Sequence, residues 1–98
     1  MKNDIQKIKE IINRSKKLLE QSYKVKNIGI FGSYAKGYAH KNSDIDILVD
    51  FYEVPDMFKF MQLEYFFRKL LGRKVDLVTR KALKPLIKSD ILKETIYL

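Results

Sequence analysis

The chain has 98 residues, a formal net charge of +8 and no cysteine or tryptophan. This length supports one domain with a single hydrophobic core, and an apolar content of 46% excludes a disordered or fibrous protein. The lack of cysteine excludes a disulfide framework, a Cys-ligated zinc site and a thiol nucleophile. No apolar run approaches the roughly 18 residues of a membrane span and no signal-peptide pattern opens the chain, so we expect a soluble cytoplasmic domain.

The first half of the chain predicts a helix followed by two strands. Apolar residues at helical spacing predict a helix over residues 4–21. Residues 25–31 are apolar and β-prone, which predicts a strand, and residues 32–37 form a turn with about one helical turn. After a polar loop at residues 40–43, carboxylates alternate with aliphatic residues over 44–51, which predicts a strand with two unlike faces.

The second half predicts a helix, a strand and a final helix. Asp56 is the expected N-cap of the first of these helices, and Gly72 its expected end. Residues 74–79 predict a strand, and Pro85 suits the first turn of a last helix. In that helix we expect the core-facing side chains to be Leu86, Ile87 and Ile91. Residues 95–98 are too short to assign.

This order of elements predicts an α+β (or α/β) domain, a small mixed β-sheet flanked by helices. We expect one domain over residues 1–98, with an N-terminal helix over 1–22, a catalytic core over 25–80 and a C-terminal helix and tail over 82–98.

The charge is unevenly distributed along the chain. A net charge of +8 first suggests nucleic-acid binding. Between residues 42 and 58, however, there is no Lys or Arg, and the charged residues are Asp44, Asp46, Asp50, Glu53 and Asp56. The sequence therefore combines an acidic segment with a basic remainder, and no dedicated nucleic-acid motif accompanies the basic residues.

Two short motifs in the first half can carry chemistry. Gly32 and Ser33 directly follow a predicted strand, where backbone amides and a hydroxyl can face an anion, although such a pair is often an ordinary turn. Asp44 and Asp46 lie two residues apart on one strand, so both carboxylates share a face and can hold a hard cation such as Mg²⁺. The alternative for this pair is a solvated strand face.

Asp76 is a third candidate, because it is the one carboxylate of an otherwise apolar strand. It is either exposed on an edge strand or, if that strand lies beside residues 44–51, part of a cluster with Asp44 and Asp46. Three such carboxylates can hold two cations roughly 3.5–4 Å apart, an arrangement used for in-line displacement at phosphorus. Asp50 has the same strand parity as Asp46, but about 13 Å separates them, too far for the same cations.

Taken together, these motifs resemble a known family. Gly32-Ser33, ten intervening residues and Asp44-Ile45-Asp46 resemble the signature of the polymerase-beta-type nucleotidyltransferases. The run GSYAKGYAHKNSDIDILVDF is similar to that of the small minimal nucleotidyltransferases, the MntA-like antitoxins. The resemblance continues through LGRKVDLV, KPLIKSDIL and ETIYL, so it spans about residues 25–98.

The resemblance implies a polymerase-beta-like nucleotidyltransferase fold and transfer of AMP from ATP with two Mg²⁺ ions. By position, Asp44 and Asp46 would bind both metals, while Asp76 would bind one and help to deprotonate the acceptor hydroxyl. The residues implied at the nucleotide are Gly32, Ser33, Lys36 and Ser43. Lys36 stands where the family often has Arg, which weakens its assignment because Lys lacks the bidentate fork. Ser43 either orients Asp44 or simply starts the strand.

The implied partner is a HEPN-domain toxin, a ribonuclease that the antitoxin neutralises by adding AMP to a toxin tyrosine. No membrane or direct nucleic-acid contact is expected. Two alternatives remain: a non-catalytic module that blocks its partner by stoichiometric contact, and a small-molecule nucleotidyltransferase, which usually carries a further domain for its acceptor. The aromatic residues between 58 and 67 are expected mostly in the core, with some left for a partner surface. His40 is expected to be exposed, with a phosphate contact as the alternative.

Overall fold

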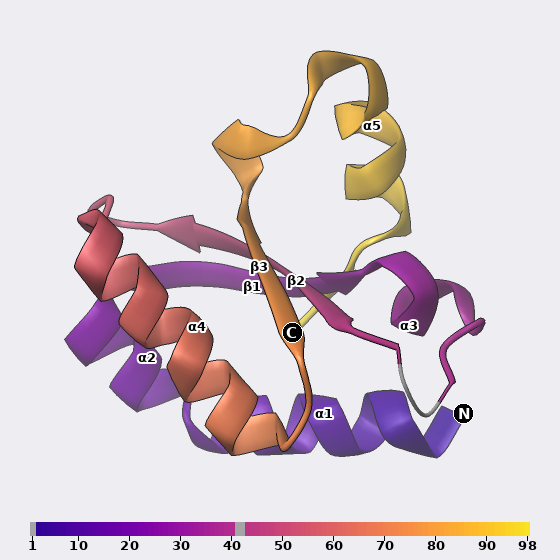
Figure 1. Ribbon diagram of the computed structural model, residues 1–98, viewed down its shortest axis with the longest axis horizontal. Helices are drawn as coiled ribbons and strands as arrows, with labels where there is room; N and C mark the ends of the chain where they lie inside the picture. Colours follow the sequence, from indigo (N-terminus) through magenta and orange to yellow (C-terminus); the bar gives the residue numbers. More distant parts are fainter. Residues whose placement is uncertain (1, 41–42) are drawn as a thin grey trace.

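A computed structural model describes residues 2–40 and 43–98, with side chains from residue 5 onward. Four strands form one sheet, and helices lie on both sides of it (Figure 1). The elements are α1 (Lys2–Arg14), α2 (Lys16–Tyr23), β1 (Val25–Phe31), α3 (Gly32–Lys36), β2 (Ile45–Phe51), α4 (Met57–Leu71), β3 (Val75–Thr79), the 3₁₀ turn η1 (Arg80–Ala82), α5 (Pro85–Glu94) and β4 (Ile96–Tyr97).

The sheet has the strand order β3-β2-β1-β4. β2 runs antiparallel to β1 and parallel to β3, while β4 is antiparallel to β1. Helices α1, α2 and α4 cover one face, whereas α5 stands over the other (Figure 1). We call this second face the open face, since one helix alone covers it only in part. The predicted fold class, a small mixed sheet flanked by helices, is confirmed.

The core lies between the sheet and α1, α2 and α4. Along β2 the aliphatic residues at alternate positions, Ile45, Ile47 and Val49, are buried toward these helices. Because successive strand residues point to opposite faces, Asp46 and Asp50 are directed to the open face. Phe67 of α4 is fully buried in the same cluster. The alternation along β2 thus fixes which face of the sheet carries the carboxylates.

Local signals for the strands and for α4 are confirmed. β1 has the predicted bounds, and β2 and β3 begin one residue later than predicted. Asp56 caps α4, because its carboxylate accepts a hydrogen bond from the Lys59 N–H at 2.8 Å. Gly72, with φ of 66°, ends the helix in the left-handed conformation that glycine adopts most easily.

The single N-terminal helix predicted over residues 4–21 is wrong, because the chain forms two helices that break at Ser15. The Ser15 N–H donates to the Ile12 carbonyl three residues back at 2.9 Å, in place of a normal α-helical bond. Ile12 and Leu19 lie on either side of the break, and both are buried in the core. Since the helical spacing of apolar residues continues across the break, the sequence pattern does not reveal it.

The C-terminal segment also departs from the prediction. Leu86 is 95% exposed and Ile87 47% exposed, so the expectation that both face the core is wrong. The reason is that α5 lies on the open face, away from the core. The unassigned tail forms β4, whose Tyr97 pairs with Gly29 of β1. A Cβ at Gly29 would collide with the Thr95 side chain, so a glycine at this position lets the tail approach β1 closely.

Two side chains of α4 cover the outer edge of β3. The Glu64 carboxylate accepts a hydrogen bond from the Leu77 N–H at 3.3 Å, and Arg68 donates to the Val75 carbonyl at 3.4 Å. Glu64 and Arg68 also pair with each other at 3.4 Å. Backbone groups that β3 cannot pair with another strand are therefore bonded to side chains.

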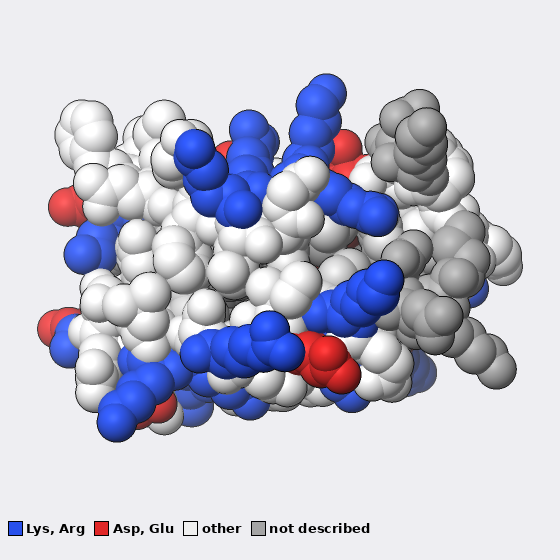
Figure 2. All heavy atoms as spheres, turned by 90° about the horizontal axis from the view of Figure 1, so that it is seen from below, with Lys and Arg blue, Asp and Glu red and all other residues white. Residues whose placement is uncertain are grey.

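Positive charge is distributed over the face formed by the N-terminal helices and α4. Figure 2 shows this face from below, with Lys and Arg side chains in several separate places among uncharged side chains and some Asp and Glu. Within residues 2–40 and 43–98, no helix is both long enough and apolar enough to cross a membrane.

Candidate active site

The parallel pairing of β2 and β3 brings two of the predicted carboxylates together. Asp46 of β2 is the register partner of Asp76 of β3. Register partners on neighbouring strands lie about 4.8 Å apart and point to the same face, here the open face. Asp44 lies two residues before Asp46, directly before β2 begins, and is exposed, as is Asp76. The predicted cluster of three carboxylates is therefore compatible with the fold.

The three carboxylates interact electrostatically. Burial, together with the negative charges of Asp76 and Asp44, raises the pKa of Asp46 from 3.8 to about 6. Asp46 is thus the half-buried centre of the group, with an exposed carboxylate on either side. A cation between these groups would relieve the repulsion, and carboxylate oxygens are the ligands that Mg²⁺ prefers.

Among the residues that the structure describes, no three His, Cys, Asp or Glu side chains are arranged to hold a metal ion. Asp44 and Asp76 are exposed, however, and their carboxylates can change rotamer at little cost. The chemistry of the donor set therefore fits a divalent cation, provided that the exposed side chains turn toward it.

Gly32 packs directly against Asp46. Phe31, the last residue of β1, is the register partner of Asp46, and Gly32 follows it with φ of +70°. A Cβ built on Gly32 would collide with the Asp46 carboxylate. Both the backbone conformation and the contact therefore require glycine at this position. The geometry places the predicted Gly32-Ser33 motif beside the carboxylates, with Ser33 half-buried in α3.

The other two predicted site residues are engaged elsewhere. The Lys36 amine lies 3.2 Å from the Glu94 carboxylate, which joins α3 to α5. The Ser43 hydroxyl oxygen accepts a hydrogen bond from the His40 N–H at 2.9 Å. Their predicted contacts with a nucleotide stay predictions. Asp50, which we expected to lie too far away, is 3.6 Å from the Arg80 guanidinium at the other end of β2.

A contact between Arg73 and Tyr34 was not predicted from the sequence. The Arg73 guanidinium donates a hydrogen bond to the Tyr34 hydroxyl and lies 5.6 Å from the centroid of its ring. Tyr34 is buried and directly follows Ser33 in α3. The contact therefore ties the turn at Gly32 to the segment that leads into β3. No local sequence pattern predicts this contact, because the two residues are 39 positions apart.

A comparison with protein families matches residues 8–98 to the nucleotidyltransferase domain family. The chain belongs to this family. The resemblance seen in the Gly-Ser and Asp-Ile-Asp motifs is thereby confirmed, and with it the prediction of a nucleotidyltransferase enzyme. Because the match covers nearly the whole chain, the helices outside the motifs belong to the family pattern as well.

Individual relatives agree with the family. A candidate protein adenylyltransferase from Methanocaldococcus jannaschii is 53% identical over 94 residues, which are 95% of this chain and 96% of that protein. Protein adenylyltransferase MntA from Thermococcus cleftensis is 44% identical over 93 residues, covering 95% and 94%. The chain is also similar to one in a toxin-antitoxin crystal structure with AMP-PNP, with a TM-score of 0.72, 30% identity, and coverage of 87% of this chain and 69% of that one.

Proposed function

We propose that this chain is a Mg²⁺-dependent protein adenylyltransferase that transfers AMP from ATP to a tyrosine hydroxyl of a HEPN-type toxin and thereby acts as its antitoxin. The observation that carries the proposal is the register pairing of Asp46 with Asp76, with Gly32 packed against Asp46. It brings the Gly-Ser turn and the carboxylates to one place on the open face. In a phosphoryl-type transfer, the protein mainly positions the reactants and compensates the charge of the phosphates.

The reaction balances without a covalent enzyme intermediate. The acceptor oxygen attacks the α-phosphorus, the bond from that phosphorus to the β-phosphate oxygen breaks, and pyrophosphate leaves. Asp76, exposed at the edge of the cluster, would take the proton of the acceptor hydroxyl. When bound at Asp44, Asp46 and Asp76, two Mg²⁺ ions would neutralise phosphate charge and align the displacement. Gly32 and Ser33 would face the phosphates through backbone N–H groups and a hydroxyl.

The comparisons support transfer of AMP to a protein in a toxin-antitoxin pair. The relatives described above are named for AMP transfer to proteins, and one structural neighbour is a toxin-antitoxin pair with an ATP analogue. The tyrosine acceptor, the HEPN fold of the partner and the requirement for Mg²⁺ rest on the family resemblance of the motifs. The experiment below tests these three features.

The test is transfer of label from α-labelled ATP to a purified HEPN-type toxin in the presence of Mg²⁺. We expect labelling by the wild type and none by Asp46→Asn, followed by mapping of the label to a tyrosine. Asp50→Asn is the matched control, because it makes the same change on the same strand and face but lies beside Arg80. Equal labelling by wild type and Asp46→Asn would contradict the proposed site.

A non-catalytic antitoxin is the second candidate, and an exposed apolar surface on α4 favours it. The side chains of Met57, Phe58, Met61 and Tyr65 are all at least 60% exposed and follow helical spacing. Such a stripe is suited to a stable protein contact. The double variant Asp44→Asn/Asp46→Asn decides between the two functions: neutralisation of the toxin without ATP would favour contact alone.

A further inference from the structure

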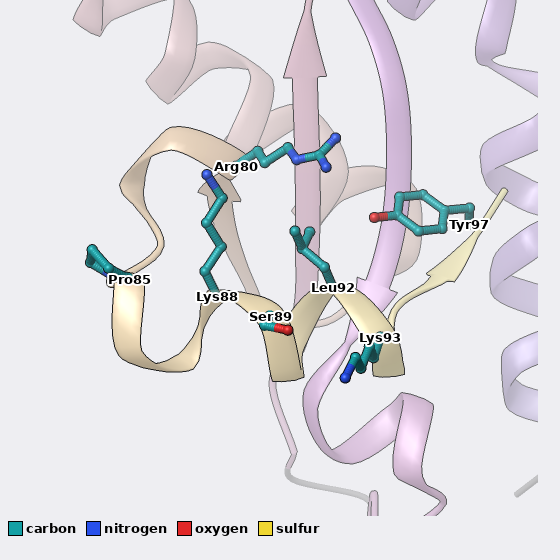
Figure 3. Close-up of a pocket in the computed structure, with 7 residues that line it drawn as sticks. All are labelled: Arg80, Pro85, Lys88, Ser89, Leu92, Lys93 and Tyr97. Atoms are coloured by element: carbon teal, nitrogen blue, oxygen red, sulfur yellow. The ribbon is translucent and has the colours of Figure 1, made fainter.

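A second feature of the open face is a shallow cavity of about 640 Å³ beside α5, which is wide open to solvent (Figure 3). Its walls are formed by the segment after β3, by α5 and by β4. The cavity is lined by the polar side chains of Arg80, Lys88, Ser89, Lys93 and Tyr97 and by the apolar side chains of Pro85 and Leu92. None of these residues belongs to the predicted active site. The volume lies in the range of cavities that bind ligands in proteins.

The lining is cationic on one wall. In Figure 3 the Lys88 amine is turned toward Arg80, the Tyr97 hydroxyl points inward from the opposite wall, and Lys93 turns away. The Arg80 guanidinium lies 3.6 Å from the Asp50 carboxylate, which neutralises part of its charge. Of the two carboxylates of α5, a helix that the structure describes throughout, Glu94 pairs with Lys36, and Asp90 forms no ion pair with Lys88. This wall therefore attracts an anion, and the two hydroxyl groups can add hydrogen bonds.

The cavity and the carboxylate cluster occupy the same face at a separation set by the sheet. Arg80 follows Asp76 by four residues at the end of β3, which corresponds to about 13 Å. Phosphates that share Mg²⁺ ions with the carboxylates must lie within a few ångströms of them, since the ions themselves are about 2.0–2.1 Å from their ligands. The anion that suits the cavity is thus a different group, and the acceptor is the other component of the reaction.

We propose that this cavity binds an acidic segment of the acceptor protein, with Arg80 and Lys88 pairing carboxylates of that segment while the acceptor hydroxyl reaches Asp76. The proposal rests on the proposed function, because it assigns the acceptor side of the same site. Charge complementarity favours an acidic segment, because the cavity wall is cationic. The carboxylate cluster that receives the hydroxyl is anionic and would repel such a segment. An acidic segment bound at the wall also holds the acceptor in one orientation across the open face.

Lys88→Gln tests the proposal by steady-state kinetics of AMP transfer to the HEPN-type toxin. We expect the KM for the toxin to rise about two- to fivefold, as for a partly exposed ion pair, with kcat and the KM for ATP unchanged. The effect should shrink as salt is added. Lys81→Gln removes the same charge nearby without lining the cavity, so it is the matched control and should leave all three constants unchanged. A rise in the KM for ATP instead, or an equal effect of Lys81→Gln, overturns the proposal.

A binding measurement separates failure of this proposal from failure of the proposed function. Amide chemical shifts of the uniformly ¹⁵N-labelled chain are followed during titration with a hexaglutamate peptide, and hexaglutamine is the uncharged control. We expect shifts confined to Lys88, Ser89 and Tyr97, lost in Lys88→Gln. These shifts report on the cavity even if no acceptor is labelled by the wild type. Absence of shifts at these residues, or equal shifts with hexaglutamine, overturns the proposal.

Discussion

Replacing Asp46 by Asn should stabilise the protein at neutral pH while abolishing transfer. The pKa of Asp46 is raised from 3.8 to about 6 by burial and by the charges of Asp76 and Asp44, so its ionised form is disfavoured in the folded state. Asn has nearly the same shape and carries no charge. The substitution therefore removes a destabilising interaction and leaves the packing against Gly32 in place.

The magnitude and its pH dependence follow from the same shift. A change from 3.8 to about 6 corresponds to an upper limit of about 3 kcal/mol, and solvent screening of a half-buried carboxylate reduces this to an expected gain of about 1 kcal/mol. Between these two pH values the folded state binds more protons than the unfolded state, so this group's contribution to stability falls as pH rises. The gain in unfolding free energy from Asp46→Asn is consequently absent below about pH 4 and reaches its full size above about pH 7.

Urea unfolding of both proteins at pH 4 and pH 8 measures the difference directly. We expect equal stability at pH 4 and, at pH 8, a variant more stable by about 1 kcal/mol, or about 4–8 °C in Tm. Asp50→Asn is the control and should bring no gain, since Asp50 lies beside Arg80. A gain of the same size at both pH values, or no gain at pH 8, would refute the electrostatic explanation.

Three further predictions concern the surroundings of this residue. Mg²⁺ should raise the Tm of the wild type and raise that of Asp46→Asn much less, as measured by a thermal scan with and without the metal. Gly32→Ala should destabilise the fold by about 1–3 kcal/mol in urea unfolding, because a Cβ there meets the Asp46 carboxylate and φ is positive; a neutral result would disprove the close packing. Tyr34→Phe should cost about 1 kcal/mol, and the loss should be absent in an Arg73→Gln background, which a double-mutant cycle measures.

Much of the fold could be predicted from local signals. β1, β2, β3 and α4 are each determined by a short stretch of sequence, such as the alternation along residues 45–49 or the cap at Asp56. The candidate carboxylates were also found from strand parity, which predicts Asp44 and Asp46 on one face, although Asp44 lies directly before β2. What parity could not supply is the register between strands, which makes Asp76 the neighbour of Asp46.

The features that were missed leave no signal in the local sequence pattern. The break at Ser15 is hidden because Ile12 and Leu19 keep helical spacing across it. β4 is two residues long, and its pairing with β1 defines it better than its own composition does. Periodicity within α5 was misleading, because the helix lies on the open face and exposes Leu86. Tertiary placement decided the outcomes for β4 and α5.

The hydrogen bonds from Glu64 and Arg68 to β3 have a consequence for how a partner approaches. β3 is an edge strand, and edge strands commonly recruit an extended segment of another protein by adding a strand to the sheet. Here the outward Leu77 N–H and Val75 carbonyl are already bonded to side chains of α4, so that route is obstructed next to Asp76. In the proposed reaction the acceptor would therefore present its hydroxyl from above the sheet, and the same two side chains protect the edge of β3 from edge-to-edge aggregation.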